Sequence, residues 1–408
     1  MSKAKKRRIH LILSVLGMCM VVCGCATSME SSMQGTNSTE LGTLEASKEE
    51  TLLMVNEPGA EELAEKKSPV NVMDVNAGWS EQVKQTISLP DEMYYLGCNE
   101  NGYFFAEDVS ENKYSDIGTY RYGFQYWTGE TEILLEPLSC YYYTYRMCGD
   151  MLVLAVSVQG EEDATKVKIF RLQESEEATE ILGQTKHTYP SLNDNGEELI
   201  AVIRDLDKET QATISKVVVY DLVTDEVEVI AEAEMSAYKN GERFVCAGGN
   251  DEDIYYVINR VGGDEIVRYS RADKTIVARC EMEYDVRFIT GVGNMVIISE
   301  SDEHYLEKAG YVGILSENAF EKVCEIPLVE ADNGKTIREA RVIGENLYFA
   351  TPSAMYALKK EEGMINLYTY DCLEGDRDAL VKEVLDVRAD GIRSLDKDAG
   401  EIIHRFVP

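Results

Sequence analysis

Asn195-Gly196 stands shortly before Leu199-Ile200-Ala201-Val202-Ile203, an uninterrupted apolar run of strand length. An Asn-Gly pair is a strong turn signal, and a short apolar run bounded by turns is typical of a strand buried on both faces. The chain continues with Val217-Val218-Val219-Tyr220-Asp221, a turn at Thr224-Asp225, and then Val227-Glu228-Val229. Because this last stretch alternates apolar with charged residues, we expect it to be half exposed. The segment predicts a small antiparallel sheet with a buried interior and an exposed outer edge.

The same turn recurs along the chain at a nearly constant spacing. Successive turns are separated by 47, 47, 53, 44, 51 and 47 residues, and an apolar run follows each of the first six. A fixed period in this range indicates a repeat architecture in which each unit is one supersecondary motif. The turns are Asn101-Gly102, Gly149-Asp150, Asn195-Gly196, Gly249-Asn250, Gly293-Asn294, Gly344 with Asn346, and Asp390-Gly391.

Each repeat has room for four antiparallel strands, which is the content of one propeller blade. We therefore predict an all-β fold, a β-propeller of four-stranded blades, with seven blades as the expected number. Seven blades of about 48 residues need about 336 residues, which places the start of the domain near residue 72. Six or eight blades remain open, because Ala379 to Arg388 could form a short helix instead of an inner strand.

The two ends of the repeat region complement each other. The chain stops after Glu401-Ile402-Ile403-His404-Arg405-Phe406, where an outer strand is due, and Gln82 to Leu89 stands in outer-strand position with no blade before it. We expect these two segments to pair, so that the N-terminal strand completes the last blade and closes the ring without a free edge.

One repeat resembles a known family. The stretch Tyr189-Pro190-Ser191-Leu192-Asn193-Asp194-Asn195-Gly196-Glu197-Glu198-Leu199-Ile200-Ala201 is similar to the repeat of TolB-type, WD40-like propellers, although Leu192 stands where that family usually has an aromatic residue. The resemblance covers one blade well and the Asn101 turn loosely. It implies a propeller and says little about function, because propellers support unrelated activities.

The N-terminus has the layout of an export signal. Five cations precede an apolar run from Leu11 to Val22, which is too short to span a bilayer comfortably. Gly24 directly precedes Cys25, and this end resembles the lipobox of bacterial lipoproteins, with Cys23 as an unusual middle residue. The resemblance implies cleavage after Gly24, acyl chains on the sulfur of Cys25, and an extracytoplasmic protein anchored to a bacterial membrane. An ordinary signal peptide or an uncleaved anchor is the alternative.

Three regions follow from these observations. Residues 1–24 are predicted to be a lipoprotein signal peptide, residues 25–70 an acidic flexible tether, and residues 71–408 the β-propeller. The tether is rich in Ser, Thr, Glu, Gln and Asn and shows no sustained apolar period, so it cannot form a packed core. Its reach is about 40 Å.

The chain is strongly acidic. Its formal charge is −34, and without residues 1–24 it keeps 35 Lys and Arg against 74 Asp and Glu, or −39. Such a surface repels nucleic acid and anionic lipid. We expect a monomer whose partner is a protein or an envelope or glycan component, and whose only membrane contact is the lipid anchor.

Common catalytic and metal signatures are missing from the sequence. There is no GxSxG nucleophile elbow, and two tryptophans are too few for sialidase-like or quinone-dependent propeller repeats. Seven cysteines remain after Cys25, without metal-ligand spacing, and we expect mostly buried apolar roles for them. We predict no cofactor. Calcium is the alternative at Asn193–Glu197 and Asp396–Glu401, although ordinary turn chemistry explains both stretches.

A ligand is expected at the propeller entrance, where loops lead into the inner strands and join the second strands to the third. Alternating tyrosines enter the second blade there and could form a stacking surface. The alternative is that half of them pack between blades. The candidate surface consists of Tyr141, Tyr143, Tyr145, Asp205, Asp207 and Asp302.

Two functional classes remain. The first is a lipid-anchored, non-catalytic binding or scaffolding module, and it is the favoured one. The second is a lipid-anchored, glycan-active hydrolase or lyase that uses scattered carboxylates at the channel mouth. Two facing carboxyl groups about 5 to 10 Å apart, with strongly perturbed pKa values, would favour the enzyme.

Overall fold

A computed structural model shows a domain built from β-strands. None of the described residues is helical, so none belongs to a helix that could cross a membrane. The structure describes residues 70–74, 81–87, 93–111, 117–159, 165–186, 192–194, 197–206, 213–235, 243–260, 263–301, 307–326, 337, 339–351, 354–361, 364–371, 382–396 and 400–407.

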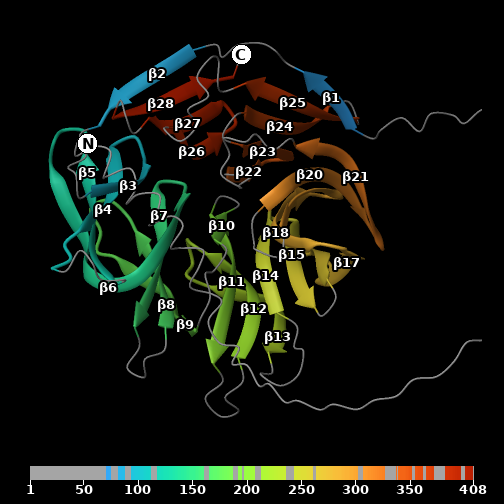
Figure 1. The fold of residues 1–408 in the computed structure, drawn as a ribbon, viewed down its shortest axis with the longest axis horizontal. Coiled ribbons are helices and arrows are strands. Elements are labelled where there is room, and N and C mark those ends of the chain that lie inside the picture. Colours follow the sequence, from blue (N-terminus) through green and yellow to red (C-terminus); the bar gives the residue numbers. More distant parts are fainter. Residues whose placement is uncertain are drawn as a thin grey trace, which may run out of the picture. The chain divides into compact units, whose positions relative to one another are not determined.

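The described strands form six sheets (Figure 1). Apart from the two N-terminal strands, neighbours in the chain are also neighbours in the sheet. The first sheet has seven strands and holds β3 (Met93–Cys98), β4 (Gly102–Asp108), β5 (Gly118–Tyr126), β6 (Thr131–Cys148), β7 (Met151–Gln159), β8 (Thr165–Leu172) and β9 (Thr179–Lys186). Three four-stranded sheets follow: β10 (Leu192–Asp194), β11 (Glu198–Leu206), β12 (Thr213–Asp221) and β13 (Val227–Met235); β14 (Arg243–Gly249), β15 (Asp253–Arg260), β16 (Gly263–Ser270) and β17 (Thr275–Glu281); and β18 (Asp285–Val292), β19 (Met295–Ser301), β20 (Glu307–Ser316) and β21 (Ala319–Ile326).

The last two sheets each recruit a strand from the N-terminal end of the described chain. One contains β22 (Glu339–Ile343), β23 (Asn346–Ala350), β24 (Ala354–Glu361), β25 (Met364–Asp371) and β1 (Val70–Asp74); the other contains β26 (Lys382–Arg388), β27 (Gly391–Asp396), β28 (Glu401–Phe406) and β2 (Glu81–Thr86). Residues 382–388 form a strand and not the helix that the sequence left open.

The seven-stranded sheet contains two four-stranded groups that share β6. The first part of this 18-residue strand pairs with β5 up to Cys140, and its second part pairs with β7 as far as Cys148. If β6 is counted in both groups, the described strands form seven groups of four, with β1 as an extra edge strand. Consecutive four-stranded antiparallel sheets of this kind are those of a β-propeller, as the sequence predicted.

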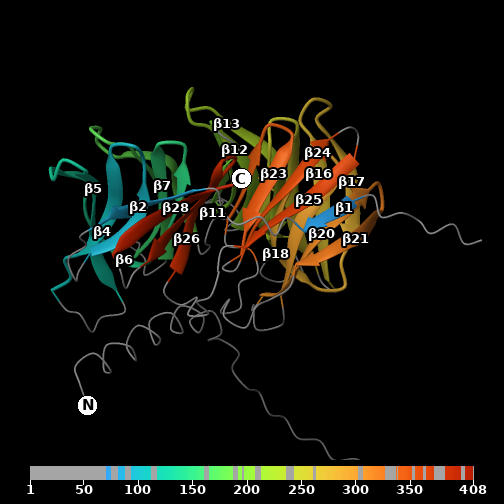
Figure 2. The same cartoon turned by 90° about the horizontal axis from the view of Figure 1, so that it is seen from above.

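The predicted pairing of the N-terminal segment with the last strand is present. β2 runs antiparallel to β28 along its whole length, with Val83 opposite His404, and the backbone N–H of Ile87 donates to Gly400 at 2.8 Å. Figure 1 shows this blue strand beside the red end of the chain. The sequence did not predict β1, which pairs in parallel with β25, as Figure 2 shows from above.

The core lies between successive sheets, because the second strand of each group is buried on both faces. In β11, Leu199 and Ala201 belong to a cluster shared with the preceding sheet, whereas Ile200 and Val202 belong to a cluster shared with the following one. This is the period-2 alternation of a strand applied to two interfaces. The same packing joins the two ends of the chain, where Ile402 of β28 shares a cluster with Phe105 of β4.

Two local features recur with the repeat. The predicted glycines Gly149, Gly293 and Gly344 occupy the first position of two-residue turns with φ of +61° each, a conformation that glycine adopts without strain. The first strands β3, β6, β14, β18 and β26 each shift register against the next strand. Such bulges change the direction in which a side chain points.

Candidate functional site

The three predicted tyrosines lie on β6, but the structure presents them differently. Tyr141 is skipped at the register shift between Cys140 and Tyr142, and its side chain is 40% exposed. Tyr143 and Tyr145 are half-buried and pack against the apolar cluster between the first two groups of strands. The bulge therefore separates one exposed tyrosine from two packed ones.

Tyr143 lies in an aromatic cluster. Its ring centroid is 5.1 Å from that of Tyr120, 5.8 Å from Tyr122 and 6.4 Å from Tyr145, with edge-on or tilted geometry. Burial raises the pKa of Tyr143 well above its ordinary value. These ring contacts have the favourable geometry of aromatic packing, so Tyr143 contributes to the core and not to an open stacking platform.

Of the three aspartates predicted for the ligand surface, only Asp205 lies within the described residues. Asp205 lies near the end of β11, opposite Ile214 of β12, and its side chain is outside the description. Asp207, Asp302, Cys25 and Gly24 all lie outside the described residues. Both candidate calcium stretches extend beyond the described residues too, and within the described part there is no cluster of three or more potential metal-ligating side chains.

Arginines on the strands were not predicted as functional residues. Arg146 of β6 donates through Nη2 to the carbonyl oxygen of Ala340 at 2.9 Å, and Arg341 of β22 donates through Nη2 to that of Met147 at 3.3 Å. The two strands belong to different sheets that are not consecutive in the chain. The available signal was an arginine within a strand of a very acidic chain, but no sequence pattern identifies a backbone carbonyl group as the acceptor.

A cavity of about 680 Å³ lies at the other end of the strands, away from the predicted entrance. The turns before β15 and after β16 border it, and Glu198 of β11 and Glu228 of β13 form its opposite wall. Its lining holds five carboxylates and three cations: Glu198, Glu228, Asp251, Glu252, Asp253, Arg268, Arg271 and Lys274.

Ion pairs cross this cavity between the two sheets. Arg271 holds Glu198 through two bonds, Nη1 to Oε2 at 2.5 Å and Nη2 to Oε1 at 2.7 Å. Glu228 lies 3.8 Å from Arg271 and 3.4 Å from Lys274. The bidentate geometry is the strong form of an arginine–carboxylate pair, and the hydrogen bonds to Glu198 raise the pKa of Arg271.

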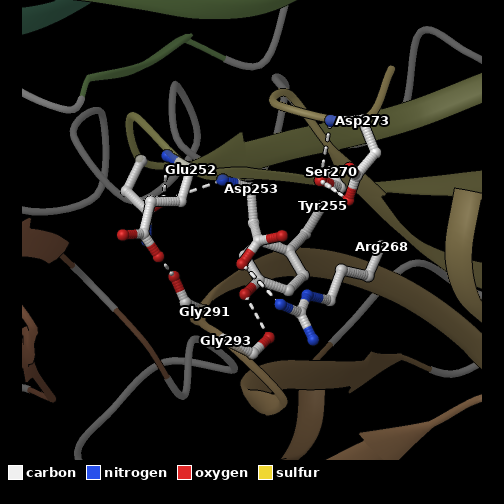
Figure 3. Close-up of polar contacts among 9 residues, drawn as sticks. Glu252, Asp253, Tyr255, Arg268, Ser270, Asp273, Gly291 and Gly293 are labelled. Carbon is white, nitrogen blue, oxygen red and sulfur yellow. Dashed lines mark hydrogen bonds and ion pairs between the residues drawn. The ribbon is translucent and has the colours of Figure 1, made fainter. Parts of the chain in front are cut away.

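The inner wall of the cavity is held by a turn and by buried side chains (Figure 3). Asn250 Oδ1 accepts hydrogen bonds from the backbone N–H groups of Glu252 and Asp253 at 2.8 and 2.9 Å. Arg268 Nη2 pairs with the buried Asp253 at 2.8 Å, and the Tyr255 hydroxyl donates to the Gly293 carbonyl at 2.6 Å. All three cations of the lining thus have a carboxylate partner. The arrangement is a polar joint between sheets, and sequence reasoning recognised only its turn at Asn250.

Among the carboxyl groups that the structure describes, Asp264 is the one whose pKa is raised above its ordinary value. Burial raises this pKa, although Asp264 accepts hydrogen bonds from Asn259 Nδ2 at 2.6 Å and from the Val286 backbone at 2.7 Å. These contacts keep the carboxylate inside a joint between β15, β16 and β18. It serves to position Asn259, and no second carboxyl group with a raised pKa accompanies it within the described residues.

The cysteines follow the predicted pattern in part. Cys98, Cys140, Cys148 and Cys246 are buried, whereas Cys280 and Cys324 are half-buried at outer strands. Cys372 lies outside the described residues. For the four buried cysteines, a role as small apolar core residues is confirmed.

Comparison with known proteins adds structural similarity at low sequence identity. No protein-family model matches this chain, and no curated protein matches its sequence. The β-propeller domain of the trilobed protease from Pyrococcus furiosus is 11% identical with a TM-score of 0.41, over 74% of this chain and 91% of that chain.

Two further solved structures are similar over a larger share of the chain. The Dos1 propeller is 9% identical with a TM-score of 0.44, over 81% of this chain and 94% of that chain. The WD40 domain of Toxoplasma gondii coronin is 10% identical with a TM-score of 0.42, over 81% and 87%. All three TM-scores are below 0.5, so the propeller assignment rests on the strand order and pairing of this chain.

Proposed function

We propose that this protein is an extracytoplasmic lipoprotein whose β-propeller acts as a non-catalytic binding or scaffolding module. The observation that carries the proposal is the order of its parts. The apolar run from Leu11 to Val22 is followed by Gly24-Cys25 and then by a polar segment whose composition cannot form a core. The first described strand begins at Val70. A lipid on Cys25 would hold the propeller at the membrane while residues 26–69 let it stand away from the surface.

The propeller itself is proposed to be a closed ring of seven blades. Counting β6 twice gives seven groups of four strands, and β2 supplies the outer strand of the last group. Closure removes the free edges between first and last units, which suits a scaffold that presents loops to a partner. The exposed Tyr141 at the β6 bulge is the part of the predicted ligand surface that supports a contact role.

Anchoring is tested by metabolic labelling of producing cells with a fatty acid. The wild-type chain is expected to carry label and to sediment with membranes. Cys25→Ser removes the acceptor sulfur and should abolish the label and release the protein, whereas Cys23→Ser should do neither. Equal labelling of the Cys25→Ser variant would contradict the anchor.

Binding is tested by crosslinking on intact cells with a photoreactive residue at position 141. A partner at the predicted surface should be captured from this position. The matched control is position 223, because Val223 is 70% exposed in the turn between β12 and β13, at the other end of the strands. Equal capture from both positions would contradict a specific contact at β6.

A further inference from the structure

The side chain of Arg204, on β11, reaches across to the neighbouring sheet at β14, and it has few hydrogen-bond partners there. Its Nη2 donates to the Phe244 carbonyl of β14 over a long 3.4 Å, and its Nε is buried without a partner. A guanidinium carries five N–H donors. This half-buried group is therefore left with unused donors where water has limited access.

A second arginine lies beside it. Arg243 immediately precedes Phe244, and its Nε donates to Asn259 Oδ1, a neutral acceptor, at 3.0 Å. Burial and the positive charge of Arg243 lower the pKa of Arg204 to about 10. The carboxylate of Asp264 reaches Arg243 only through Asn259. Among the described residues, neither Arg204 nor Arg243 forms an ion pair.

The backbone around this pair is fixed from the neighbouring sheet. Ser215 of β12 lies opposite Arg204 of β11, and its Oγ accepts the Phe244 N–H at 3.2 Å. Ser215 and Phe244 are both buried. Ser215 thus fixes the backbone of Phe244, whose carbonyl Arg204 contacts and which directly follows Arg243. Such rigid placement is the preorganisation that a binding site needs.

Among the side chains that the structure describes, no acid pairs with Arg204 or Arg243. With 74 acidic against 40 basic residues, an unpaired cation is not expected by composition. Two desolvated like charges cost free energy unless an anion compensates them. Seven other arginines of the described part each form an ion pair with a carboxylate: Arg121, Arg171, Arg260, Arg268, Arg271, Arg279 and Arg287.

We propose that Arg204 and Arg243 bind an oxyanion, the phosphate or carboxylate group of a ligand, at the joint between β11 and β14. The inference rests on the proposed function as a binding module and specifies the chemistry that the module recognises. Guanidinium groups suit planar or tetrahedral oxyanions because their donors form a fork. Since the chain carries a formal net charge of −34, this local pair of cations would select both the position and the charge of the ligand.

Isothermal titration calorimetry of the full chain in detergent tests the site, with ionic strength held constant by NaCl. Inorganic phosphate and acetate are titrated in separate arms, and the anion that binds more tightly identifies the group. The expected result is one saturable site. Arg243→Gln should weaken binding about tenfold or more, because it removes one of two charged donors. Arg121→Gln removes the same charge from an arginine already paired with Glu107, and should leave binding unchanged.

Several outcomes would overturn the inference. They are no saturable binding of either anion, or equal weakening by Arg243→Gln and Arg121→Gln. Without anion, Arg243→Gln is expected to keep or raise the midpoint of thermal unfolding, since it relieves repulsion; a clear fall would make Arg243 a structural residue. Arg204→Met is a second variant. If the Arg204→Met protein does not fold, the Arg243→Gln protein alone decides the test. Failure of the Cys25 labelling would leave the calorimetric result intact, so the two proposals fail separately.

Discussion

Arg146 and Arg341 exchange hydrogen bonds between two sheets that are far apart in the chain. Arg146 donates to the carbonyl of Ala340, the residue before Arg341, and Arg341 donates to the carbonyl of Met147, the residue after Arg146. Both donors are charged and both acceptors are backbone atoms of first strands. The reciprocal pair of hydrogen bonds therefore links β6 and β22 directly, from side chain to backbone in both directions.

Removing either arginine should destabilise the domain. Arg146→Gln and Arg341→Gln are each expected to lower the free energy of unfolding by about 1–3 kcal/mol, the range for a hydrogen bond from a charged group. The two bonds hold the same contact, so the double variant should lose less than the sum. Urea unfolding measures all three. Arg121→Gln, whose ion pair with Glu107 is partly exposed, should cost less than about 1 kcal/mol. If the loss of unfolding free energy in the double variant equalled the sum of the single losses, the two bonds would not hold the same contact.

Ile87 should be important for keeping the N-terminal strand in place. Its side chain is buried in a cluster with Phe105 and Ile402, directly after β2. Ile87→Ala is expected to lower the free energy of unfolding by about 2–5 kcal/mol, because it leaves a cavity at the junction of the first and last strands. Val223→Ala changes an exposed side chain and should cost less than about 0.5 kcal/mol. Equal effects in chemical denaturation would show that this junction is not part of the folded core.

Substitutions of two tyrosines on β6 should have different effects, one on the stability of the fold and the other on partner binding. Tyr143→Ala removes a half-buried ring with three aromatic neighbours and is expected to cost about 2–4 kcal/mol. Tyr141→Ala, at the bulge, should cost less than about 1 kcal/mol and instead reduce the amount of partner that a general amine-reactive crosslinker captures on intact cells. Thermal unfolding together with the crosslinking assay distinguishes the two. A large loss of stability in the Tyr141 variant would assign this residue to the core.

The Arg271–Glu198 pair should couple the two sheets around the cavity. A double-mutant cycle with Arg271→Gln and Glu198→Gln is expected to give a coupling free energy of about 0.5–2 kcal/mol, since the contact is bidentate and half-buried. High salt should reduce it only in part, because buried pairs are screened less than exposed ones. Lys274→Gln serves as the control, since its side chain is 73% exposed and should contribute little. A coupling free energy of zero would contradict a stabilising contact between the two sheets through Arg271 and Glu198.

Tyr220 and Asp225 should show linked titration. The Tyr220 hydroxyl donates to Asp225 Oδ1 at 2.6 Å, and this bond is the main reason why the pKa of Asp225 is lowered. Burial, followed by this bond, raises the pKa of Tyr220 to about 12. Because the pKa of Asp225 is lowered on folding, its contribution to stability is present above its ordinary pKa and is lost as pH falls. The contribution of Tyr220 is present below its ordinary pKa and is lost as pH rises through about 12.

Tyr220→Phe is therefore expected to raise the pKa of Asp225 toward its ordinary value, measured by NMR titration of the carboxyl carbon. Asp221 is an internal control in the same spectrum. Backbone N–H groups of Thr224 and Val223 lower its pKa, and the substitution leaves them in place. A similar rise in the pKa values of both Asp225 and Asp221 would point to a rearranged turn and would contradict a specific effect of the Tyr220 hydrogen bond.

Much of the fold was accessible to sequence reasoning because it depends on local alternation. The period of about 48 residues and the apolar runs such as 199–203 follow from strands that are buried on both faces. The outer strand missing after 401–406, with Gln82 to Leu89 in outer-strand position, predicted the contact that the structure shows between 81–86 and 401–406. The parallel strand β1 was missed, since Val70–Asp74 is short and its partner β25 lies almost 300 residues away. The bulges were missed as well, because an extra residue shifts the phase of alternation by only one position, and a strand that is buried on both faces has little alternation to shift.

By itself the sequence determined the repeat, the antiparallel order within each repeat and the residues that face the core, because turn chemistry and the alternation of side chains along a strand are local properties. The Gly24-Cys25 anchor is likewise a prediction from sequence. Only the tertiary structure decided that Tyr141 is exposed while Tyr143 is packed, that Arg146 and Arg341 meet, and that Arg204 of β11 reaches the backbone of Phe244 next to Arg243. Those relationships depend on which sheets pack against each other and on bulges that reorient side chains, so residues distant in the chain acquire a common environment only when the domain is folded.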